Sequence, residues 1–329
     1  MNSAAKKPTS TASPLSKDAI SAAHERIRGS VLETPVEDVS DLFLQTRARV
    51  YFKMENLQNT GSFKLRGATN KILGLSKSHA QAGVIAASNG NHGLGVAEAA
   101  RSACIPAEVF VSEHVSASKA RRIEQAGAII RRVGTDPLEA ELAARAAAVA
   151  SGKVFISPYN DFDVMAGQGT IAVELLQQLG LLDAVFVAVG GGGLIGGIGA
   201  YMKAASPQTE VVGCWPQNSP VLYESIKAGR ILEVPEKPTV SESTAGGLEE
   251  DSVTLDVCSR VIDRSVLVSE DEIHSAMRVV RDSRGWLIEG AAGVAVAAFI
   301  KEGARYQDRR VAVIICGGNL SEKVLARIE

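Results

Sequence analysis

The sequence of 329 residues lacks several features that would point to particular classes of protein. It has only four cysteines, at positions 104, 214, 258 and 316, and no two of them form a Cys-x-x-Cys pair. Their wide spacing argues against a zinc site and against a disulfide framework, and it fits a reducing compartment. We therefore expect a cytoplasmic protein.

An excess of charge of one sign and a long apolar run are also missing. The net charge of -2 provides no electrostatic footprint for nucleic acid or for an anionic membrane, so we expect neither as a partner. No apolar run is long enough to span a bilayer. Residues 1–17 have neither the apolar core of a secretory signal nor the arginines of a transit peptide. We expect residues 1–15 to form a disordered tail.

Helix-like and strand-like segments alternate along the rest of the chain. The first helix is predicted at 18–29, with Asp18 as its cap. Strands are predicted at 50–54, 83–87, 107–111, 129–133, 154–157, 184–189, 210–214 and 310–315. Further helices are predicted at 63–75, 94–103, 117–126, 138–150, 167–179 and 194–205. Continuous Val/Ile runs indicate strands buried on both faces, and their alternation with helices predicts parallel sheets in an α/β fold. The length is sufficient for two lobes.

The segment 61–68, Gly-Ser-Phe-Lys-Leu-Arg-Gly-Ala, places Lys64 where a strand gives way to a helix. A lysine at such a junction is partly desolvated. Its amine then has a lowered pKa and can form a Schiff base with a carbonyl.

Four glycines at 190–193 follow an apolar strand and precede a helix. Their backbone N–H groups and the positive end of the helix favour a phosphate. A tight turn without ligand is the alternative, but four glycines cost more conformational entropy than a turn requires. The loop also matches the dinucleotide fingerprint at Gly191, Gly193 and Gly196. That fingerprint requires an acid after the next strand, where this chain has Trp215.

Two further polar segments lie at predicted strand ends. The segment 88–93, Ser-Asn-Gly-Asn-His-Gly, offers donors for a carboxylate or a phenolate oxygen, although it could simply cap a helix. The segment 316–319 reads Cys-Gly-Gly-Asn, and its Cys316 could equally be a buried core thiol.

These segments together resemble the motifs of the fold type II (β-family) enzymes that use pyridoxal 5'-phosphate (PLP). The serine/threonine dehydratase–serine racemase branch fits best. The resemblance covers about Ser16 to the C-terminus. It implies a two-lobe α/β fold like that of tryptophan synthase β, with parallel sheets flanked by helices. A large PLP-binding domain would comprise 16–82 and 158–329, and a small domain 83–157. It also implies a homodimer.

The resemblance implies a role for each motif residue. Lys64 would hold PLP as a Schiff base and then act as the base on the substrate, with Phe63 near the ring. Ser88 would be catalytic and, with Asn89 and Gly90, would bind the substrate carboxylate. The remaining cofactor contacts would come from Asn91 at the ring hydroxyl, Cys316 at the pyridine nitrogen, and Gly190, Gly191, Gly192, Gly193 and Leu194 at the phosphate.

His92 and Glu289 each have two possible roles. His92 is expected to be structural rather than a general base, since a base assignment needs geometry first. Glu289 is either a residue near the cofactor or a buried structural carboxylate.

The implied activity is that of a dehydratase (ammonia-lyase), which converts a β-hydroxy L-amino acid to a 2-oxo acid and ammonia. The substrate could be threonine, serine or a bulkier 3-hydroxy amino acid such as 3-phenylserine or 3-hydroxyaspartate. The alternatives are an amino-acid racemase or a β-replacement synthase of the same fold. A PLP-binding protein without turnover is the third.

Two departures from the family pattern narrow these alternatives. Serine racemase has a second serine, an acid/base, where this chain has Asn89, so we expect little racemisation. Metal-dependent relatives have Glu-Pro-x-Asn-x-x-Asp where this chain has Trp215 and Val221 at the two carboxylate positions. Because hard cations require oxygen ligands, we expect no divalent metal.

Overall fold

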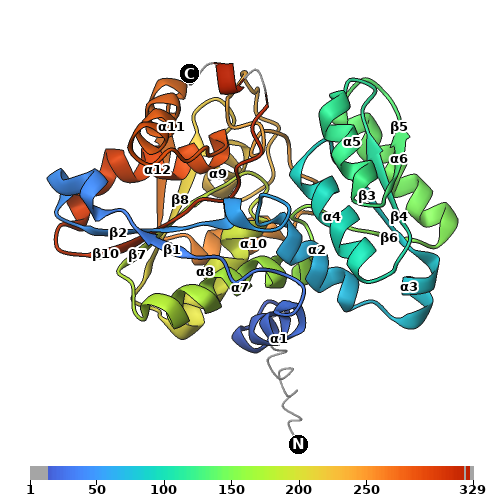
Figure 1. The fold of residues 1–329 in the computed structure, drawn as a ribbon, viewed down its shortest axis with the longest axis horizontal. Helices are drawn as coiled ribbons and strands as arrows, with labels where there is room; N and C mark the ends of the chain where they lie inside the picture. The colour runs from blue at the N-terminus through green and yellow to red at the C-terminus, as the bar shows by residue number, and fades with distance from the viewer. Residues whose placement is uncertain (1–13, 322–323, 327–329) are drawn as a thin grey trace, which may run out of the picture.

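The structure, a computed structural model, describes residues 14–321 and 324–326 (Figure 1). Residues 1–13 of the predicted tail lie outside this range. Leu15 is described, and its side chain is buried in the same core as Ile20. Only residues 14 and 15 of the expected tail lie inside the described range, so the disordered tail stays a prediction.

The strands form two separate sheets. The larger has six strands in the order β1 (Val36–Asp38), β2 (Arg49–Lys53), β10 (Arg310–Ile314), β7 (Ala184–Ala188), β8 (Glu210–Pro216) and β9 (Arg264–Val268). The smaller has four, in the order β5 (Ile129–Arg132), β4 (Ala107–Val111), β3 (Val84–Ala87) and β6 (Val154–Phe155). All pairings are parallel except β1 with β2. The predicted α/β class with parallel sheets is confirmed.

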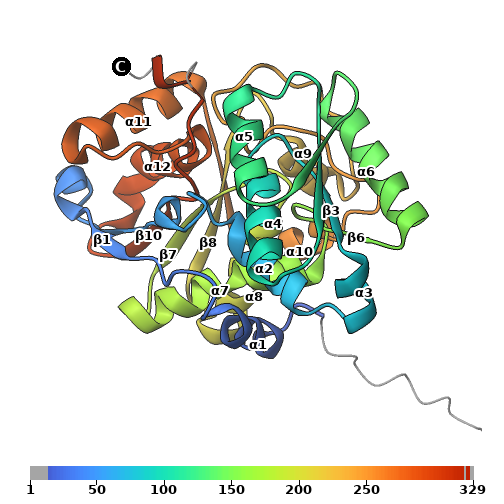
Figure 2. The same ribbon diagram turned by 45° about the vertical axis from the view of Figure 1, so that its right-hand side comes forward.

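Helices cover both faces of each sheet (Figures 1 and 2). On the larger sheet, α7 (Phe162–Leu179) and α8 (Gly193–Ala205) lie on one face with α1 (Lys17–Ile27), and α11 (Glu270–Arg284) and α12 (Gly290–Glu302) lie on the other. On the smaller sheet, α4 (Asn91–Ser102) and α5 (Ala117–Gln125) lie opposite α6 (Pro137–Ser151). The remaining helices are α2 (Lys64–Leu73), α3 (Lys77–Ala82), α9 (Val221–Ala228) and α10 (Thr254–Val261). Short 3-10 helices lie at η1 (Ser40–Thr46), η2 (Glu55–Leu57) and η3 (Gly303–Tyr306).

Helix α2 connects the two sheets. It packs against α4 on one side and α7 on the other. Its Leu65, Ala68 and Ile72 are buried in the core of the smaller sheet, although residues 16–82 were assigned to the large domain. The four strands of the smaller sheet all fall within 83–157. The domain boundaries themselves stay a prediction.

Several helix starts differ from the sequence-based prediction, and side chains cap the observed starts of α1 and α7. Helix α1 is capped by Ser16 rather than Asp18, because the Ser16 hydroxyl accepts a hydrogen bond from the Ala19 N–H at 3.1 Å. Helix α7 begins at Phe162, five residues before the predicted start of 167, because the Asp161 carboxylate caps it. Among the described residues, no helix is long and apolar enough to cross a membrane.

Candidate functional site

Lys64 is the first residue of α2, and its side chain reaches the loop after β6. Its Nζ donates to the carbonyl of Pro158 at 2.9 Å and lies 5.1 Å from the centre of the Phe63 ring. Burial lowers the pKa of Lys64 to about 8, and this effect exceeds the smaller, opposite effect of the acidic groups Cys316 and Glu289. Much of this amine is therefore neutral near pH 8, as Schiff-base chemistry requires.

A buried ionic cluster holds the start of α2 in place. Arg66 is fully buried, and its guanidinium lies 2.7 Å from Glu55 and 2.5 Å from Glu174. Glu174 also accepts from the buried amine of Lys53 at 2.5 Å. The cluster contains two positive and two negative side chains, so each buried charge has a partner. The arginine of the lysine motif thus has a structural role, which is to tie α2 to η2 and α7.

The motif glycine that follows Arg66 allows two helices to touch. A Cβ at Gly67 would lie 2.3 Å from Gln168, and one at Gly167 would lie 2.6 Å from Gly67 Cα. Gln168 in turn accepts a hydrogen bond from the Gly67 N–H at 3.1 Å. The position of Lys64 therefore depends on a close α2–α7 crossing.

Three of the four glycines, at 190–192, lie between β7 and α8, and Gly193 is the first residue of α8. Gly192 has a φ of +87°, which favours glycine. A Cβ at Gly191 would lie 2.4 Å from the Tyr159 ring, and one at Gly190 would lie 2.7 Å from Thr244 Cα. The first N–H groups of α8 have no carbonyl partner within the helix, so they can bind an anion.

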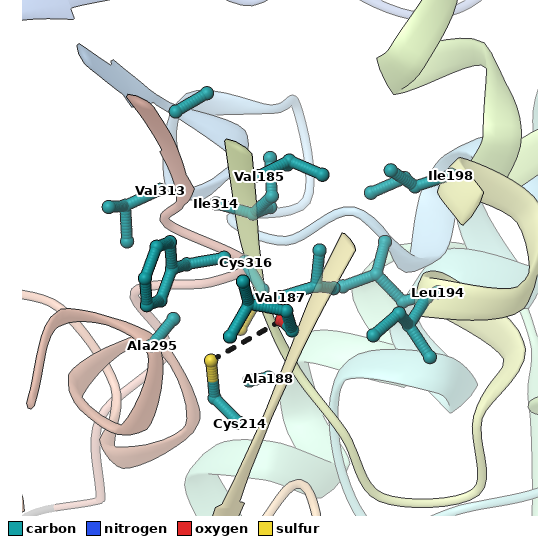
Figure 3. Close-up of a cluster of buried hydrophobic side chains, with 14 of the residues drawn as sticks. Val185, Val187, Ala188, Leu194, Ile198, Cys214, Ala295, Val313, Ile314 and Cys316 are labelled. Carbon is teal, nitrogen blue, oxygen red and sulfur yellow. Dashed lines mark hydrogen bonds between the residues drawn. The ribbon is translucent and has the colours of Figure 1, made fainter. Parts of the chain in front are cut away.

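Leu194, predicted as a phosphate contact, places its side chain in the core. Figure 3 shows it packed in the buried cluster that includes Val187, Ile198 and Cys214. Only its backbone N–H is therefore free to face a phosphate.

Several polar groups of the loop after β3 form hydrogen bonds within the protein. The Ser88 hydroxyl accepts from the Gly90 N–H at 3.1 Å. The Asn89 side chain is bonded to Ser112 at both ends, donating to its hydroxyl and accepting from its N–H, each at 2.9 Å. The Asn89 side-chain amide is therefore held toward Ser112, with one N–H of Nδ2 not used by that residue.

His92 is buried, and its Nε2 lies 2.8 Å from the carbonyl of Ile156. Burial and the charge of Lys64 lower the pKa of His92 to about 3. The ring is therefore neutral at physiological pH and joins α4 to the end of β6. This is the arrangement of a structural histidine, as expected.

The Cys-Gly-Gly-Asn segment lies beside the lysine segment. Phe63 N–H donates to the carbonyl of Cys316 at 3.0 Å, and Ser62 pairs with Gly317 in an isolated β-bridge. Glu289 is buried against this segment, with Oε1 3.9 Å from the Cys316 thiol. Burial raises the pKa of both Cys316 and Glu289, which favours their neutral forms.

Asn91 also contacts Glu289, because its Nδ2 donates a hydrogen bond to Glu289 Oε2 at 2.8 Å. These contacts join Glu289 to two of the predicted cofactor-binding residues, and its role near the cofactor stays a prediction. Asn91 and Cys316, which come from separate motifs, contact this glutamate, and Lys64 lies near enough for Glu289 to act on its pKa.

Sequence reasoning missed Pro158, Tyr159 and Asn319. Pro158 accepts from Lys64 and Tyr159 lies against Gly191, so these two neighbours join the lysine to the glycine loop. The only available signal was their position at a predicted strand end, where ligands gather in parallel sheets.

Trp215 packs in the core of the larger sheet. It is fully buried at the end of β8, where Gly213 leaves room for its ring, and its ring centre is 5.5 Å from that of Tyr223. It is therefore a core residue. At residues 14–321 and 324–326, no three or more His, Cys, Asp or Glu side chains gather closely enough to hold a metal. The expected absence of a divalent metal stays a prediction.

These residues fit PLP. A buried amine of lowered pKa, a glycine loop at a helix start and a neutral thiol lie in one region, joined by Pro158 and Tyr159. The amine suits the carbonyl of PLP, and the glycine loop suits its phosphate.

Comparisons with known proteins agree with this fit. The sequence profile of the family described as "Pyridoxal-phosphate dependent enzyme" matches residues 27–317. The L-threonine ammonia-lyase of Thermotoga maritima is 37% identical over 309 residues, which are 94% of this chain and 77% of that protein. The phenylserine dehydratase of Ralstonia pickettii is 33% identical, over 94% of each chain. The crystal structure of serine racemase from Dictyostelium discoideum matches with a TM-score of 0.87 at 31% identity, covering 94% of this chain and 100% of that one. The chain therefore belongs to the fold type II pyridoxal-phosphate dependent enzymes, in the branch of serine/threonine dehydratases and serine racemases, and is a PLP-dependent lyase.

Proposed function

We propose that the protein is a dehydratase that converts a β-hydroxy L-amino acid to a 2-oxo acid and ammonia. The observation that carries this proposal is the buried Lys64 amine of lowered pKa, which bonds to Pro158 next to the Tyr159 ring that lies against the glycine loop. Threonine, serine, 3-phenylserine and 3-hydroxyaspartate are the candidate substrates. Relatives named L-threonine ammonia-lyase and phenylserine dehydratase support this class.

Lys64 has two tasks in this proposal. Its amine would hold the cofactor carbonyl until the substrate amine displaces it, and the freed amine would then take the α-proton of the substrate at Nζ. When bound, PLP supplies an electron sink for the charge left on the α-carbon. A pKa near 8 suits both tasks, because the neutral amine is populated close to working pH.

Cys316 and the glycine loop set the environment of the cofactor. In the arrangement that the resemblance implies, the Cys316 thiol faces the ring nitrogen. Burial raises the pKa of this thiol, and a neutral thiol would hold the ring nitrogen of PLP without supplying a proton, which would suit elimination. The N–H groups of residues 190–194 bind the phosphate.

The loop at 88–91 binds the rest of the substrate and the ring. The Ser88 hydroxyl and the backbone N–H of Asn89 hold the substrate carboxylate, and Gly90 contributes by donating its N–H to the Ser88 hydroxyl. Asn91 donates to the ring oxygen of the cofactor.

We further propose a cytoplasmic homodimer with domains at 16–82 plus 158–329 and at 83–157. The four cysteines are unpaired among the described residues, which is compatible with a reducing compartment. Light scattering of the purified protein would measure the mass in solution, and a monomer would contradict the dimer.

The function is tested by release of 2-oxo acid and ammonia from L-threonine, L-serine, threo-3-phenylserine and threo-3-hydroxyaspartate. Lys64→Ala should abolish release. Lys77→Ala, which changes an exposed lysine in α3, should release product as the wild type does.

The result of the product-release assay distinguishes between the candidate functions. Release that depends on Lys64 supports a dehydratase, and the best substrate identifies the side-chain specificity. A protein that binds PLP but releases nothing would contradict the proposal. Product formed only with an added nucleophile would indicate β-replacement instead.

A further inference from the structure

We propose that Asn319 is a positioning residue that orients the Asn91 amide toward the cofactor ring, and that Arg122 holds Asn319 in place from helix α5. This inference rests on the proposed function, in which Asn91 donates to the ring oxygen of PLP. Neither Asn319 nor Arg122 belongs to the predicted set of cofactor contacts.

Four hydrogen bonds connect these side chains in one continuous chain. Arg122 Nη2 donates to Asn319 Oδ1 at 2.9 Å. Asn319 Nδ2 donates to the carbonyl of Thr60 at 2.9 Å and to Asn91 Oδ1 at 2.7 Å. Asn91 Nδ2 then donates to Glu289 Oε2 at 2.8 Å.

The ends of this chain determine the orientation of both amides. A guanidinium can only donate and a backbone carbonyl can only accept. Asn319 therefore keeps its oxygen toward Arg122 and its nitrogen toward Thr60 and Asn91. Asn91 must then present its oxygen to Asn319, which leaves its nitrogen on the side of Glu289.

Glu289 alone could not impose this orientation. Burial raises the pKa of Glu289, and a protonated carboxyl could donate to a reversed Asn91 amide as readily as accept from the present one. With Asn319 in place, Asn91 keeps a second N–H for the ring oxygen. A reversed amide would turn Oδ1 toward that oxygen and repel it.

The backbone leaves room for the Asn319 side chain. Gly61, which opens the lysine segment, has a φ of +75°, and a Cβ there would lie 2.7 Å from Asn319 Oδ1. The same glycine N–H and C=O bond to Gln58 and Gly318. Any larger residue at position 61 would displace the amide that orients Asn91.

The chain also joins the two sheets. Arg122 is exposed on α5, beside the smaller sheet, whereas Asn319 follows β10 of the larger one. The contact between α5 and Asn319 therefore links the packing of the two lobes to the group that faces the ring.

The test compares Asn319→Asp and Arg122→Ala with Arg121→Ala, a change to the exposed neighbour in α5. Absorbance titration of each apoprotein with PLP measures affinity and the absorbance maximum, and circular dichroism measures the melting temperature. Asn319→Asp should weaken PLP binding roughly 10- to 100-fold and shift the maximum, as for loss of one hydrogen bond to a charged group. Arg122→Ala should weaken it about two- to fivefold, and Arg121→Ala should leave it unchanged.

Wild-type affinity and an unchanged maximum in Asn319→Asp and Arg122→Ala would overturn the inference. A lower melting temperature with an unchanged maximum would also overturn it, because it would show a purely structural role. If Asn319→Asp does not fold, Asn319→Ser provides the same comparison without a buried charge. The binding test does not require turnover, so it remains valid even if the dehydratase assay fails. A wild-type protein that binds no PLP would contradict the proposed function itself.

Discussion

At Lys64, burial and neighbouring charge act in opposite directions on one amine. Removing the ammonium from water lowers its pKa, and the charges of Cys316 and Glu289 raise it. Desolvation is the larger effect, so the pKa falls from 10.5 to about 8. Both neighbours are themselves buried with raised pKa values, which limits the negative charge that could oppose the shift.

This shift predicts how the apoprotein captures PLP at different pH values. Only the neutral amine attacks a carbonyl, so the rate should rise about tenfold per pH unit below pH 8 and level off near pH 8. Stopped-flow absorbance measures the rate, and N-acetyl-lysine, whose amine has an ordinary pKa, is the control. A protein rate that keeps rising to pH 10 would show that the Lys64 amine is not desolvated.

Asn89 predicts the stereochemical outcome. Its amide has no titratable proton and is bonded to Ser112 at both ends, so it cannot exchange a proton with the opposite face of the substrate. We expect serine racemisation to be far slower than elimination, measured by chiral chromatography alongside 2-oxo acid release. Asn89→Ser should increase the ratio of racemisation to elimination. Equal rates in the wild type would refute the assignment.

Among the helices, the crossing of α2 and α7 is the closest contact that positions Lys64. Gly167→Ala would gain about 1 kcal/mol of helix propensity. Its Cβ would lie 2.6 Å from Gly67 Cα and 2.7 Å from the Arg66 carbonyl, so the helices must move apart. We expect a net loss of roughly 1–2 kcal/mol in the free energy of unfolding, measured with urea. Gly29→Ala, with no heavy atom within 4 Å, is the control and should change it by less than about 0.5 kcal/mol.

Removing Arg66 from the buried ionic cluster should lower the free energy of unfolding more than the Gly167→Ala change does. Arg66→Met would leave the Glu55 carboxylate buried without its positive partner, at a cost of about 3–5 kcal/mol in the free energy of unfolding. The deficit should shrink as pH falls, because Glu55 can then be buried in its neutral form. Arg260→Ala breaks an exposed pair with Asp256 and should cost less than about 0.5 kcal/mol. Equal losses in the two variants would contradict the argument.

For the molecule as a whole, the structure predicts dependence on PLP but not on a divalent cation. Trp215 and Val221 occupy the positions where metal-dependent relatives have carboxylates, and both are buried and apolar. Activity on the best substrate should therefore be unchanged after dialysis against EDTA and after addition of magnesium. A loss in EDTA that magnesium restores would place a metal site elsewhere in the protein.

Local pattern was sufficient for much of the fold. The strands at 107–111, 184–188 and 310–314 were predicted to within a residue because each is a short apolar run with a clear boundary. The segment 221–302 was not predicted, although β9, α11 and α12 lie within it. Its α12 is apolar on all sides because it is buried between β-sheet and helix, so it has no periodicity to read. Helix α11 does have a local signal, a capping box from Ser269 to Glu272.

The sequence by itself determined the residues that carry the chemistry: Lys64, the glycines at 190–193 and Cys316 lie in short motifs whose residue types already suit an amine, a phosphate and a neutral partner. Only the tertiary structure decided which side chains orient them. Glu289 and Asn319 meet Asn91 from positions about 200 residues away, as their hydrogen bonds show. Likewise, Asn89 turns to Ser112 rather than to the substrate. The physical reason is that an amine reacts with a carbonyl, and N–H groups bind a phosphate, because of the residue types alone. The orientation and burial of a side chain depend instead on partners that only the fold brings into contact.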